Sequence, residues 1–223
     1  MINGYKKIYC DFDGTITKID SVYNFFCLHA DENWLDDEKL WQEGKISSRE
    51  CMERQIKKLP AMDKTSLYEF IETIEIDEYF IEFYNYAKSK GIEIIILSDG
   101  LDLFIKETLK KYSLDIKYYA NNLVYYGNRF SVNFCNYSND CNVKAGSCKC
   151  SKITEKDFCY IGDGTSDLCV AKKARLLFAK NKLKKHCENL NLKYISFSTF
   201  KDILEMFNES ERGINDLLNR VNK

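Results

Sequence analysis

Short apolar runs alternate along this chain with longer segments in which apolar residues recur every three or four positions. The runs predict buried strands and the periodic segments predict amphipathic helices. The predicted strands are Lys6–Cys10, Ile92–Leu97, Ile116–Ala120, Asp157–Ile161, Leu176–Ala179 and Tyr194–Phe197, and the helices among them are Tyr79–Lys90, Leu101–Tyr112, Ser166–Lys173, Lys182–Asn189 and Thr199–Phe207. This alternation favours an α/β fold with a Rossmann-like three-layer core, in which helices cover both faces of a parallel sheet.

A purely helical stretch interrupts the alternation after the first strand. From Asp20 to Asp77 the apolar residues follow helical spacing, and no strand-like run appears before Ile92. Ser47 and Glu50 have the spacing of a helix-capping box, and Pro60 ends the helix that they begin. We therefore expect a small all-helical insert of residues 18–78, with residues 1–17 and 79–223 forming the core.

Two local signals concern the second half of the chain. Leu123–Tyr126 and Arg129–Phe134 flank Gly127-Asn128, which suits the two-residue turn of a β-hairpin. The last dozen residues are polar and predict a loosely packed helix.

Two aspartates stand at the end of the first predicted strand, in the stretch Cys10-Asp11-Phe12-Asp13-Gly14-Thr15-Ile16-Thr17. Because side chains alternate along a strand, Asp11 and Asp13 can face one pocket at its carboxyl end. Two carboxylates this close repel each other and favour a bound cation, and their hard oxygen atoms suit Mg²⁺. An acidic surface turn after an edge strand is the alternative interpretation.

Further polar groups follow later strands. Ser98, Asp99 and Gly100 come after the run that ends at Leu97, while Asp163 and Asp167 belong to the stretch Gly162-Asp163-Gly164-Thr165-Ser166-Asp167. Lys152 precedes that second stretch. Together with Asp-Phe-Asp-Gly-Thr, this ordered set resembles the haloacid dehalogenase-like (HAD) phosphatase superfamily over most of the chain.

The resemblance implies a mechanism for hydrolysing a phosphate monoester. Asp11 would attack phosphorus, and Asp13 would act as the general acid and later as the base. The ligands of the Mg²⁺ ion would be Asp11, Asp163 and the backbone carbonyl of Asp13. The phosphate would be bound by Ser98, by backbone N–H groups around Asp99 and Gly100, and by Lys152. Asp167 would orient the lysine or a metal-bound water from outside the ligand set.

Taken singly, several of these residues have ordinary structural explanations. Ser98 could cap a helix, Lys152 could be a solvated surface lysine, and Asp167 could be a helix-start acid favoured by the helix dipole. Lys144, Lys149 and Lys156 are also near the expected lysine position. Lys152 is preferred because of its distance from the strand at Asp157 and because it follows a cysteine-rich stretch.

The helical insert resembles the cap of the phosphoserine phosphatase-like subgroup, which covers the site and contacts the leaving group. Asp20, where phosphoserine phosphatases usually carry Glu, and Arg54, six residues before Pro60, match cap positions that could bind an amine and a carboxylate. A helix cap and a surface charge are the alternatives for these two residues.

A closer similarity is to the branch containing the 2-hydroxy-3-keto-5-methylthiopentenyl-1-phosphate phosphatases. It rests on Asp-Phe-Asp-Gly-Thr-Ile-Thr, the spacing from Arg54 to Pro60, the pattern Ser98-x-Gly-x-Asp102-x-Phe104 and the cysteines before the lysine. Phosphoserine phosphatases and phosphoethanolamine/phosphocholine phosphatases are alternatives within the superfamily. A phosphomutase, and a phosphate-sensing module without catalysis, are alternatives from other functional classes.

Composition narrows the partners. The chain has 223 residues, of which 45% are hydrophobic, and its 33 basic and 34 acidic residues leave a net charge of -1. This balance gives no reason to expect binding to nucleic acid or to an acidic membrane. The polar start of the chain and the lack of a long apolar run predict a cytoplasmic protein, a monomer or homodimer that acts on a small phosphorylated metabolite.

Ten cysteines are many for a chain with no secretory signal. Four of them fall in one short segment: Cys135, Cys141, Cys148 and Cys150. Three interpretations of these four remain open, namely a structural zinc site, a redox-sensitive pair and reduced thiols.

Overall fold

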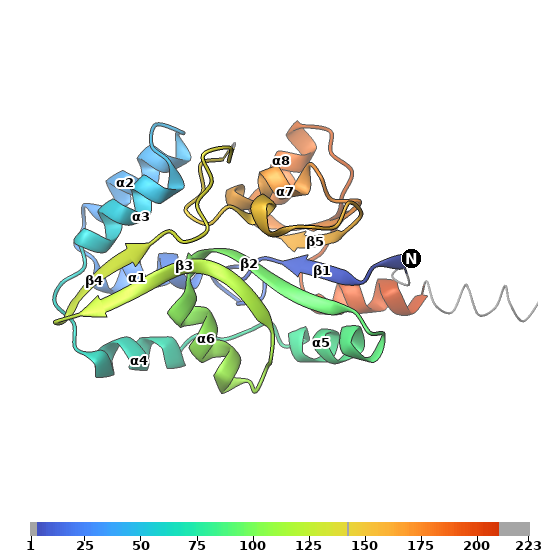
Figure 1. Cartoon of the computed structure of the whole chain (residues 1–223), viewed down its shortest axis with the longest axis horizontal. Helices are drawn as coiled ribbons and strands as arrows, with labels where there is room; N and C mark the ends of the chain where they lie inside the picture. The colour runs from blue at the N-terminus through green and yellow to red at the C-terminus, as the bar shows by residue number, and fades with distance from the viewer. Residues whose placement is uncertain (1–3, 142, 210–223) are drawn as a thin grey trace, which may run out of the picture.

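The computed structural model describes residues 4–141 and 143–209 (Figure 1). Its centre is a seven-stranded sheet in the order β4-β3-β2-β1-β5-β6-β7, in which only the β3–β4 pair is antiparallel. The strands are β1 Lys7–Cys10, β2 Glu93–Leu101, β3 Lys117–Tyr126, β4 Arg129–Asn133, β5 Cys159–Gly162, β6 Leu176–Ala179 and β7 Ile195–Ser196. The predicted α/β class with a mostly parallel sheet is confirmed.

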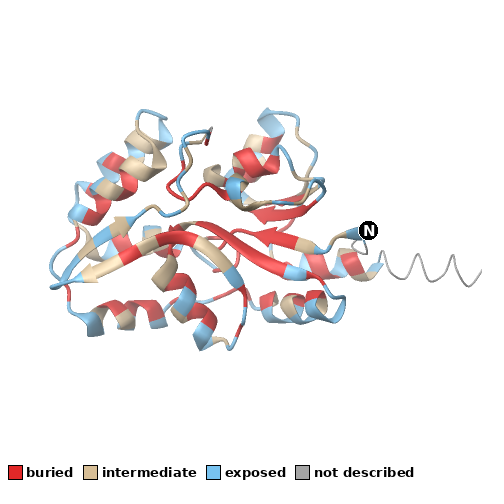
Figure 2. Cartoon of the chain, in the orientation of Figure 1, coloured by how far each residue is buried: buried red, intermediate tan, exposed pale blue. Residues whose placement is uncertain are grey.

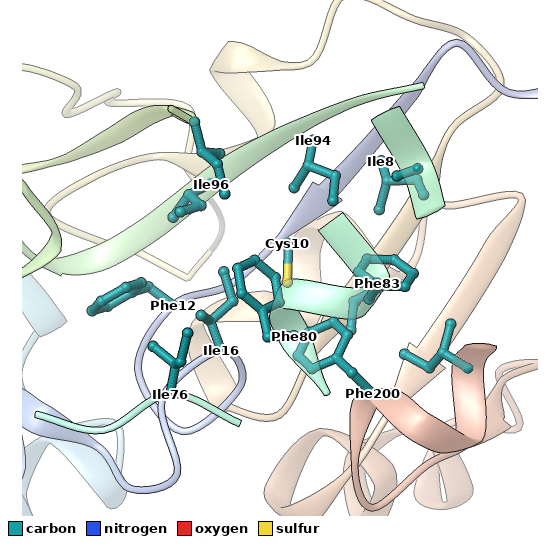
Figure 3. Packing of buried hydrophobic residues seen from close by; sticks show 14 of the residues in the cluster. Ile8, Cys10, Phe12, Ile16, Ile76, Phe80, Phe83, Ile94, Ile96 and Phe200 are labelled. Carbon is teal, nitrogen blue, oxygen red and sulfur yellow. The ribbon is translucent and has the colours of Figure 1, made fainter. Parts of the chain in front are cut away.

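Alternating side chains of the central strands supply two separate cores. Ile8, Cys10 and Ile96 point to one face, where they pack with α5 (Phe80–Ser89), α6 (Asp102–Lys111) and the helical residues 200–209. Figure 3 shows this packing around Cys10, Phe80 and Phe200. Tyr9 and Ile95 point to the other face, toward α7 (Leu168–Ala171) and α8 (Asn181–Asn189). Because both faces are covered, the central strands are almost wholly buried, as Figure 2 shows.

Four helices lie between β1 and α5: α1 Ser21–His29, α2 Trp34–Gln42, α3 Ser48–Lys57 and α4 Lys64–Glu72. The two ends of this helical segment lie side by side, because Thr17 forms a β-bridge with Ile76 and the Asp77 N–H donates to the Ile16 carbonyl. These helices pack in a second hydrophobic cluster built on aromatic residues such as Phe25 and Phe70, which Leu101, Phe104 and Leu123 of the sheet and α6 also join. An all-helical insert after the first strand is therefore present.

Polar side chains cap the starts of three of these helices. The Ser47 hydroxyl accepts from the Glu50 N–H and caps α3, as predicted, while the Glu50 carboxylate binds Arg54. Asp20 and Asp63 cap α1 and α4 in the same way. Each such cap satisfies one backbone donor that the helix itself leaves free.

The predicted hairpin is confirmed at Gly127-Asn128, where both residues have positive φ angles of 55° and 64°. The strand before it is longer than expected, because one continuous β3 replaces the two short runs read from the sequence. After β4 the chain has little regular structure until the 3₁₀ helix η2 (Lys149–Lys152). Within the described ranges, no helix is long and apolar enough to cross a bilayer. The predicted C-terminal helix of the last dozen residues lies outside the described residues.

Candidate active site

Three adjacent strands bring the predicted acidic and hydroxyl groups together. Asp11 follows β1, Ser98 lies near the end of β2, and Asp163 follows β5. Since β2, β1 and β5 are neighbours and run in parallel, their carboxyl ends meet at one edge of the sheet. This edge lies beneath α2 and α3 on one side and α7 and α8 on the other, which occupy the same face of the sheet in Figure 1.

A cluster of three carboxylates stands at this edge. One oxygen atom each from Asp11, Asp163 and Asp167 lies within 4.8 Å of the others. Burial, and then the negative charge of Asp167, raises the pKa of both Asp11 and Asp163 above its ordinary value. A divalent cation would relieve this repulsion, and an all-oxygen donor set of this kind fits Mg²⁺.

Lys149 supplies the positive charge closest to this cluster. Its ammonium lies 2.8 Å from Asp11 Oδ1 and also contacts Asp167 Oδ1, and its side chain is 1% exposed. Burial alone would lower the pKa of Lys149, but the charges of Asp11 and Asp167 outweigh burial and raise it. Lys149 is therefore a fixed cation beside the Asp11 carboxylate.

Asp167 holds this arrangement together instead of pointing freely at a metal. Its Oδ1 accepts from Lys149 and from the Tyr160 hydroxyl, and its Oδ2 accepts from the backbone N–H groups of Asp163 and Gly164. Four donors saturate the lone pairs of the carboxylate. Asp167 thus contacts Lys149 and not Lys152, and its role in orienting a lysine stays a prediction.

The prediction that Lys152 binds phosphate needs correction. The Lys152 ammonium lies 5.2 Å from the centre of the Tyr119 ring, in a cation–π contact away from the carboxylates. Lys149 is the first residue of η2 and Lys152 is the last, and of the two it is Lys149 that pairs with Asp11 and Asp167. Spacing alone could not distinguish the two because the intervening segment has no regular period.

Asp13 stands apart from the carboxylate cluster. Its Oδ1 accepts from the backbone N–H and the hydroxyl of Ser21, and its Oδ2 accepts from the Ser98 hydroxyl at 3.2 Å. Burial, helped by the charge of Asp20, raises the pKa of Asp13 to about 6. A carboxyl with this pKa can carry a proton close to neutral pH, as a general acid must.

Gly100 is required by the close approach of Asp13. A Cβ atom at position 100 would lie 2.2 Å from Asp13 Oδ2. The backbone N–H of Gly100 donates to the Ser98 hydroxyl, which in turn donates to Asp13. Ser98 and Gly100 thus position the Asp13 carboxyl, and both line the pocket.

Asp99 joins three parts of the molecule. Its carboxylate accepts from the Ser48 hydroxyl on α3, from the Asn121 amide on β3 and from the Ser147 backbone N–H. Ser147 lies two residues before Lys149, so Asp99 connects the helical insert to the segment that carries the lysine. Only the backbone of Asp99 was expected to contribute, and this side-chain role was missed.

A pocket of about 460 Å³ opens above the carboxylates. Its floor includes Asp11, Asp13 and Asp163, and its walls come from α1, α2 and α3. The wall residues include three polar ones, Glu38, Ser48 and Gln55. The others are mainly apolar or aromatic: Tyr23, Phe26, Trp34, Trp41, Cys51 and Met52. Its volume is that of a small-molecule site.

The two predicted contacts of the insert have different locations. Asp20 lines the pocket, and its carboxylate caps α1 through the Tyr23 N–H. Arg54 is not among the residues lining the pocket, and its guanidinium pairs with Asp37 and Glu50. The structure therefore brings Asp20 to the site and leaves Arg54 away from it.

Other residues of the site were not predicted. The Thr15 hydroxyl donates to Asp163 Oδ1 at 3.0 Å, and the Asn181 amide donates to Asp163 Oδ2 at 3.2 Å. Asn181 has a φ of 49°. Its position shortly after β6 could have indicated it from the sequence, because the site is built at the carboxyl ends of the parallel strands. Ser21 and Tyr160 gave no comparable signal.

Comparisons with known proteins identify the family of this chain. The family described as haloacid dehalogenase-like hydrolase matches residues 8–172. A curated relative from Brevibacillus brevis, named 2-hydroxy-3-keto-5-methylthiopentenyl-1-phosphate phosphatase, is 30% identical over 93% of this chain and 97% of its own length. A curated relative from Bacillus pumilus with the same name is 31% identical over 90% of each chain.

A solved structure titled as a phospho-aspartyl intermediate analogue of phosphoserine phosphatase superposes with a TM-score of 0.67 at 20% identity, covering 91% of this chain and 98% of that one. At this identity the likeness concerns the fold. The resemblance expected from the motifs is confirmed by the family match and by the relatives. The chain belongs to the haloacid dehalogenase-like hydrolase family.

Proposed function

We propose that this protein is a Mg²⁺-dependent phosphatase that hydrolyses a small phosphate monoester through a phosphorylated Asp11. The observation that carries the proposal is that Asp11 and Asp163 converge at the floor of one pocket, with the buried Lys149 in contact with Asp11. A phosphate dianion repels a carboxylate nucleophile, so a site for such attack needs local positive charge. Family membership and the names of the relatives support the same reaction.

The carboxylate cluster suits a resident cation. Asp11 and Asp163 would be its protein ligands, and the Asp13 carbonyl is a further expected ligand. Bound Mg²⁺ would neutralise charge on the phosphoryl oxygens. Thr15 and Asn181 fix the two oxygens of Asp163, so that carboxylate is oriented before a cation arrives.

The remaining steps are assigned to groups of the chain. Asp11 attacks phosphorus while Lys149, held by Asp167, offsets negative charge beside the nucleophile. Asp13 protonates the leaving oxygen and then removes a proton from the water that attacks the aspartyl-phosphate. The Ser98 hydroxyl and backbone N–H groups around Asp99 and Gly100 would donate to the phosphoryl oxygens.

We also propose that residues 18–78 form a cap that selects the leaving group. Their aromatic and Met52 side chains wall the pocket above the acidic floor. The relatives' name describes an ester with an apolar methylthio end, which such a wall would suit. A substrate of this type is favoured over phosphoserine, because Arg54, the expected partner of a carboxylate, is paired with Asp37 and Glu50.

An ester with a positively charged amine, such as phosphoethanolamine or phosphocholine, is the second candidate substrate. Asp20 and Glu38 line the same pocket as Tyr23 and Trp34, and acids beside aromatic rings can bind a cation. A phosphate sensor is less favoured because Asp13 is positioned as an acid, and a phosphomutase is less favoured because the relatives are named phosphatases. A cytoplasmic location and a monomeric or homodimeric state stay predictions.

The test is phosphate release from p-nitrophenyl phosphate and from a panel of phosphorylated metabolites, with and without Mg²⁺. We expect release that requires the metal and is lost in Asp11→Asn, with the fold unchanged by circular dichroism. Activity that persists in Asp11→Asn, or substrate consumption without free phosphate, would contradict the proposal.

A further inference from the structure

Two cysteines that the proposed chemistry does not use lie beside the lysine of the site. The Sγ of Cys150 is 2.9 Å from the Sγ of Cys169. Cys150 follows Lys149 in η2, and Cys169 lies in α7, two residues after Asp167. The thiol contact therefore runs parallel to the Lys149–Asp167 ion pair and joins the same two segments.

The two sulfur atoms differ in access. Cys169 is buried in the cluster that covers one face of the sheet, while Cys150 packs against that cluster and is partly exposed. A small oxidant can thus reach Cys150 first, with Cys169 in place to react next. The segment between β4 and η2 has little regular structure, so a covalent tie at its end would restrict it more than one between two long helices.

We propose that Cys150 and Cys169 form a reversible disulfide that ties the Lys149 segment to α7. With a peroxide as oxidant, the Cys150 thiolate attacks one oxygen, the O–O bond breaks, and a sulfenic acid and water form. The Cys169 sulfur then attacks the Cys150 sulfur and displaces a second water. Two electrons pass from the two sulfur atoms to the peroxide, and a dithiol returns them to reverse the bond.

The electrostatic setting supports Cys150 as the attacking thiol. A hydrogen bond from Cys169, together with the charge of Lys173, lowers the pKa of the Cys150 thiol against the opposing effect of burial. A thiolate is the reactive form of cysteine toward peroxides.

The bond should tighten the site without dismantling it. A disulfide has an S–S distance near ~2.05 Å, so the sulfur atoms need to move less than about 1 Å in total. Lys149 and Asp167 belong to the joined segments, and their contact can survive so small a shift. We therefore expect the oxidised protein to keep its turnover and to resist unfolding better than the reduced protein.

The experiment uses the full chain with the exposed Cys27 and Cys135 replaced by serine, so that surface thiols do not react. The protein is treated with one equivalent of hydrogen peroxide, digested without reduction and analysed by peptide mass spectrometry. We expect one cross-linked peptide pair containing Cys150 and Cys169, which dithiothreitol separates. The melting temperature should rise by at least about 4 °C on oxidation, because the disulfide closes the loop from Cys150 to Cys169.

Cys150→Ser in the same background is the informative variant, because its partly exposed side chain tolerates the change. It should show neither the cross-linked pair nor the rise in melting temperature, whereas Cys187→Ser should keep both. Three outcomes would each overturn the proposal. Cys150 and Cys169 could stay unlinked, one of them could link to Cys141 or Cys148 instead, or stoichiometric zinc could shield both thiols. The functional benefit of fixing the Lys149 segment depends on the proposed function. Peptide mass and melting temperature are measured without activity, so the two proposals can fail separately.

Discussion

The Lys149 ammonium lies 2.8 Å from Asp11 Oδ1, and the two side chains are only 1% and 7% exposed. A buried ion pair costs desolvation that its attraction only partly repays, so stability alone is a weak reason for it. Positioned beside a pocket floor of three carboxylates, the pair instead has a clear chemical use. It keeps one positive charge next to the proposed nucleophile.

Replacing Lys149 should therefore remove most of the activity. Lys149→Ala should lower kcat by roughly 10²- to 10³-fold, the usual cost of one transition-state stabilising group. Lys152→Ala should stay within about twofold of wild type, as for a surface substitution away from the site. Steady-state hydrolysis of p-nitrophenyl phosphate compares the two; equal losses in both variants would contradict the assignment of Lys149.

The role of Asp13 predicts a dependence on the leaving group. Asp13→Asn should lower kcat by about 10²- to 10⁴-fold for an alkyl phosphate, whose alkoxide needs protonation. For p-nitrophenyl phosphate the loss in the first step should be much smaller, because nitrophenolate leaves without a proton. Pre-steady-state release of nitrophenol measures that first step, and an equal loss with both esters would argue against Asp13 as the acid.

The contact between Ser48 and Asp99 predicts coupling between the helical insert and the site. Ser48→Ala should lower kcat/KM by roughly 3- to 10-fold, because a charged acceptor loses one donor. The exposed hydroxyl of Ser66, which also bonds an aspartate, provides the control, and Ser66→Ala should leave kcat/KM unchanged. If Ser48→Ala behaves like that control, the contact does not help to position the insert.

Gly100 predicts a steric test of the same site. Gly100→Ala would place its Cβ 2.2 Å from Asp13 Oδ2, so the carboxyl must move away from Ser98. We expect a large loss of kcat with a stability cost of about 1 to 3 kcal/mol, typical of overpacking. Gly44→Ala, where a Cβ would meet nothing within 4 Å, controls for the change of residue type, although its φ of 71° adds some strain. Undiminished kcat in Gly100→Ala would show that Asp13 adopts another position during turnover.

Glu155 predicts the pH dependence of stability outside the site. Burial alone would raise the pKa of Glu155, but hydrogen bonds from Lys7 and Tyr9 outweigh it and lower the pKa to about 2. A depressed carboxyl pKa stabilises the fold above the unfolded-state pKa, and the stabilisation is lost as pH falls toward the folded value. Glu155→Gln should thus lower the melting temperature by about 2 to 4 °C at pH 7.

The difference from wild type should shrink below about pH 4.5, the range in which unfolded glutamate binds a proton. Thermal unfolding between pH 3 and pH 7 measures it. Asp157→Asn, which breaks an ion pair whose side chains are 66% and 60% exposed, should change little at any pH. A difference for Glu155→Gln that grows on acidification would have the wrong sign.

The sheet and the positions of Asp11, Ser98 and Asp163 could be predicted because they depend on local patterns. Apolar runs fix the strands, and a polar residue directly after a parallel strand must lie at its carboxyl end. The family and its fold could likewise be predicted from motifs of this kind in their order along the chain.

Lys149 could not be separated from Lys152 because the choice depends on how an irregular segment folds. Lys149 and Lys152 begin and end the same short 3₁₀ helix, and they differ in their tertiary contacts: Lys149 pairs with Asp11, and Lys152 contacts the Tyr119 ring. Arg54 was predicted to reach the substrate from its spacing to Pro60 within one helix. Its pairing with Asp37 is a tertiary contact with another helix, which spacing along the chain does not reveal. The Cys150–Cys169 contact joins residues from different parts of the chain, so the grouping of four nearby cysteines did not predict it.

The most direct test of the account is the mass of the Asp11 peptide during turnover. The protein is mixed with Mg²⁺ and p-nitrophenyl phosphate, quenched in acid within the first turnover and digested for mass spectrometry. The account predicts one added phosphoryl group on the peptide that contains Asp11, absent in Asp11→Asn. Rapid nitrophenol release with no phosphoryl group on Asp11, or with the group on another residue, would contradict it.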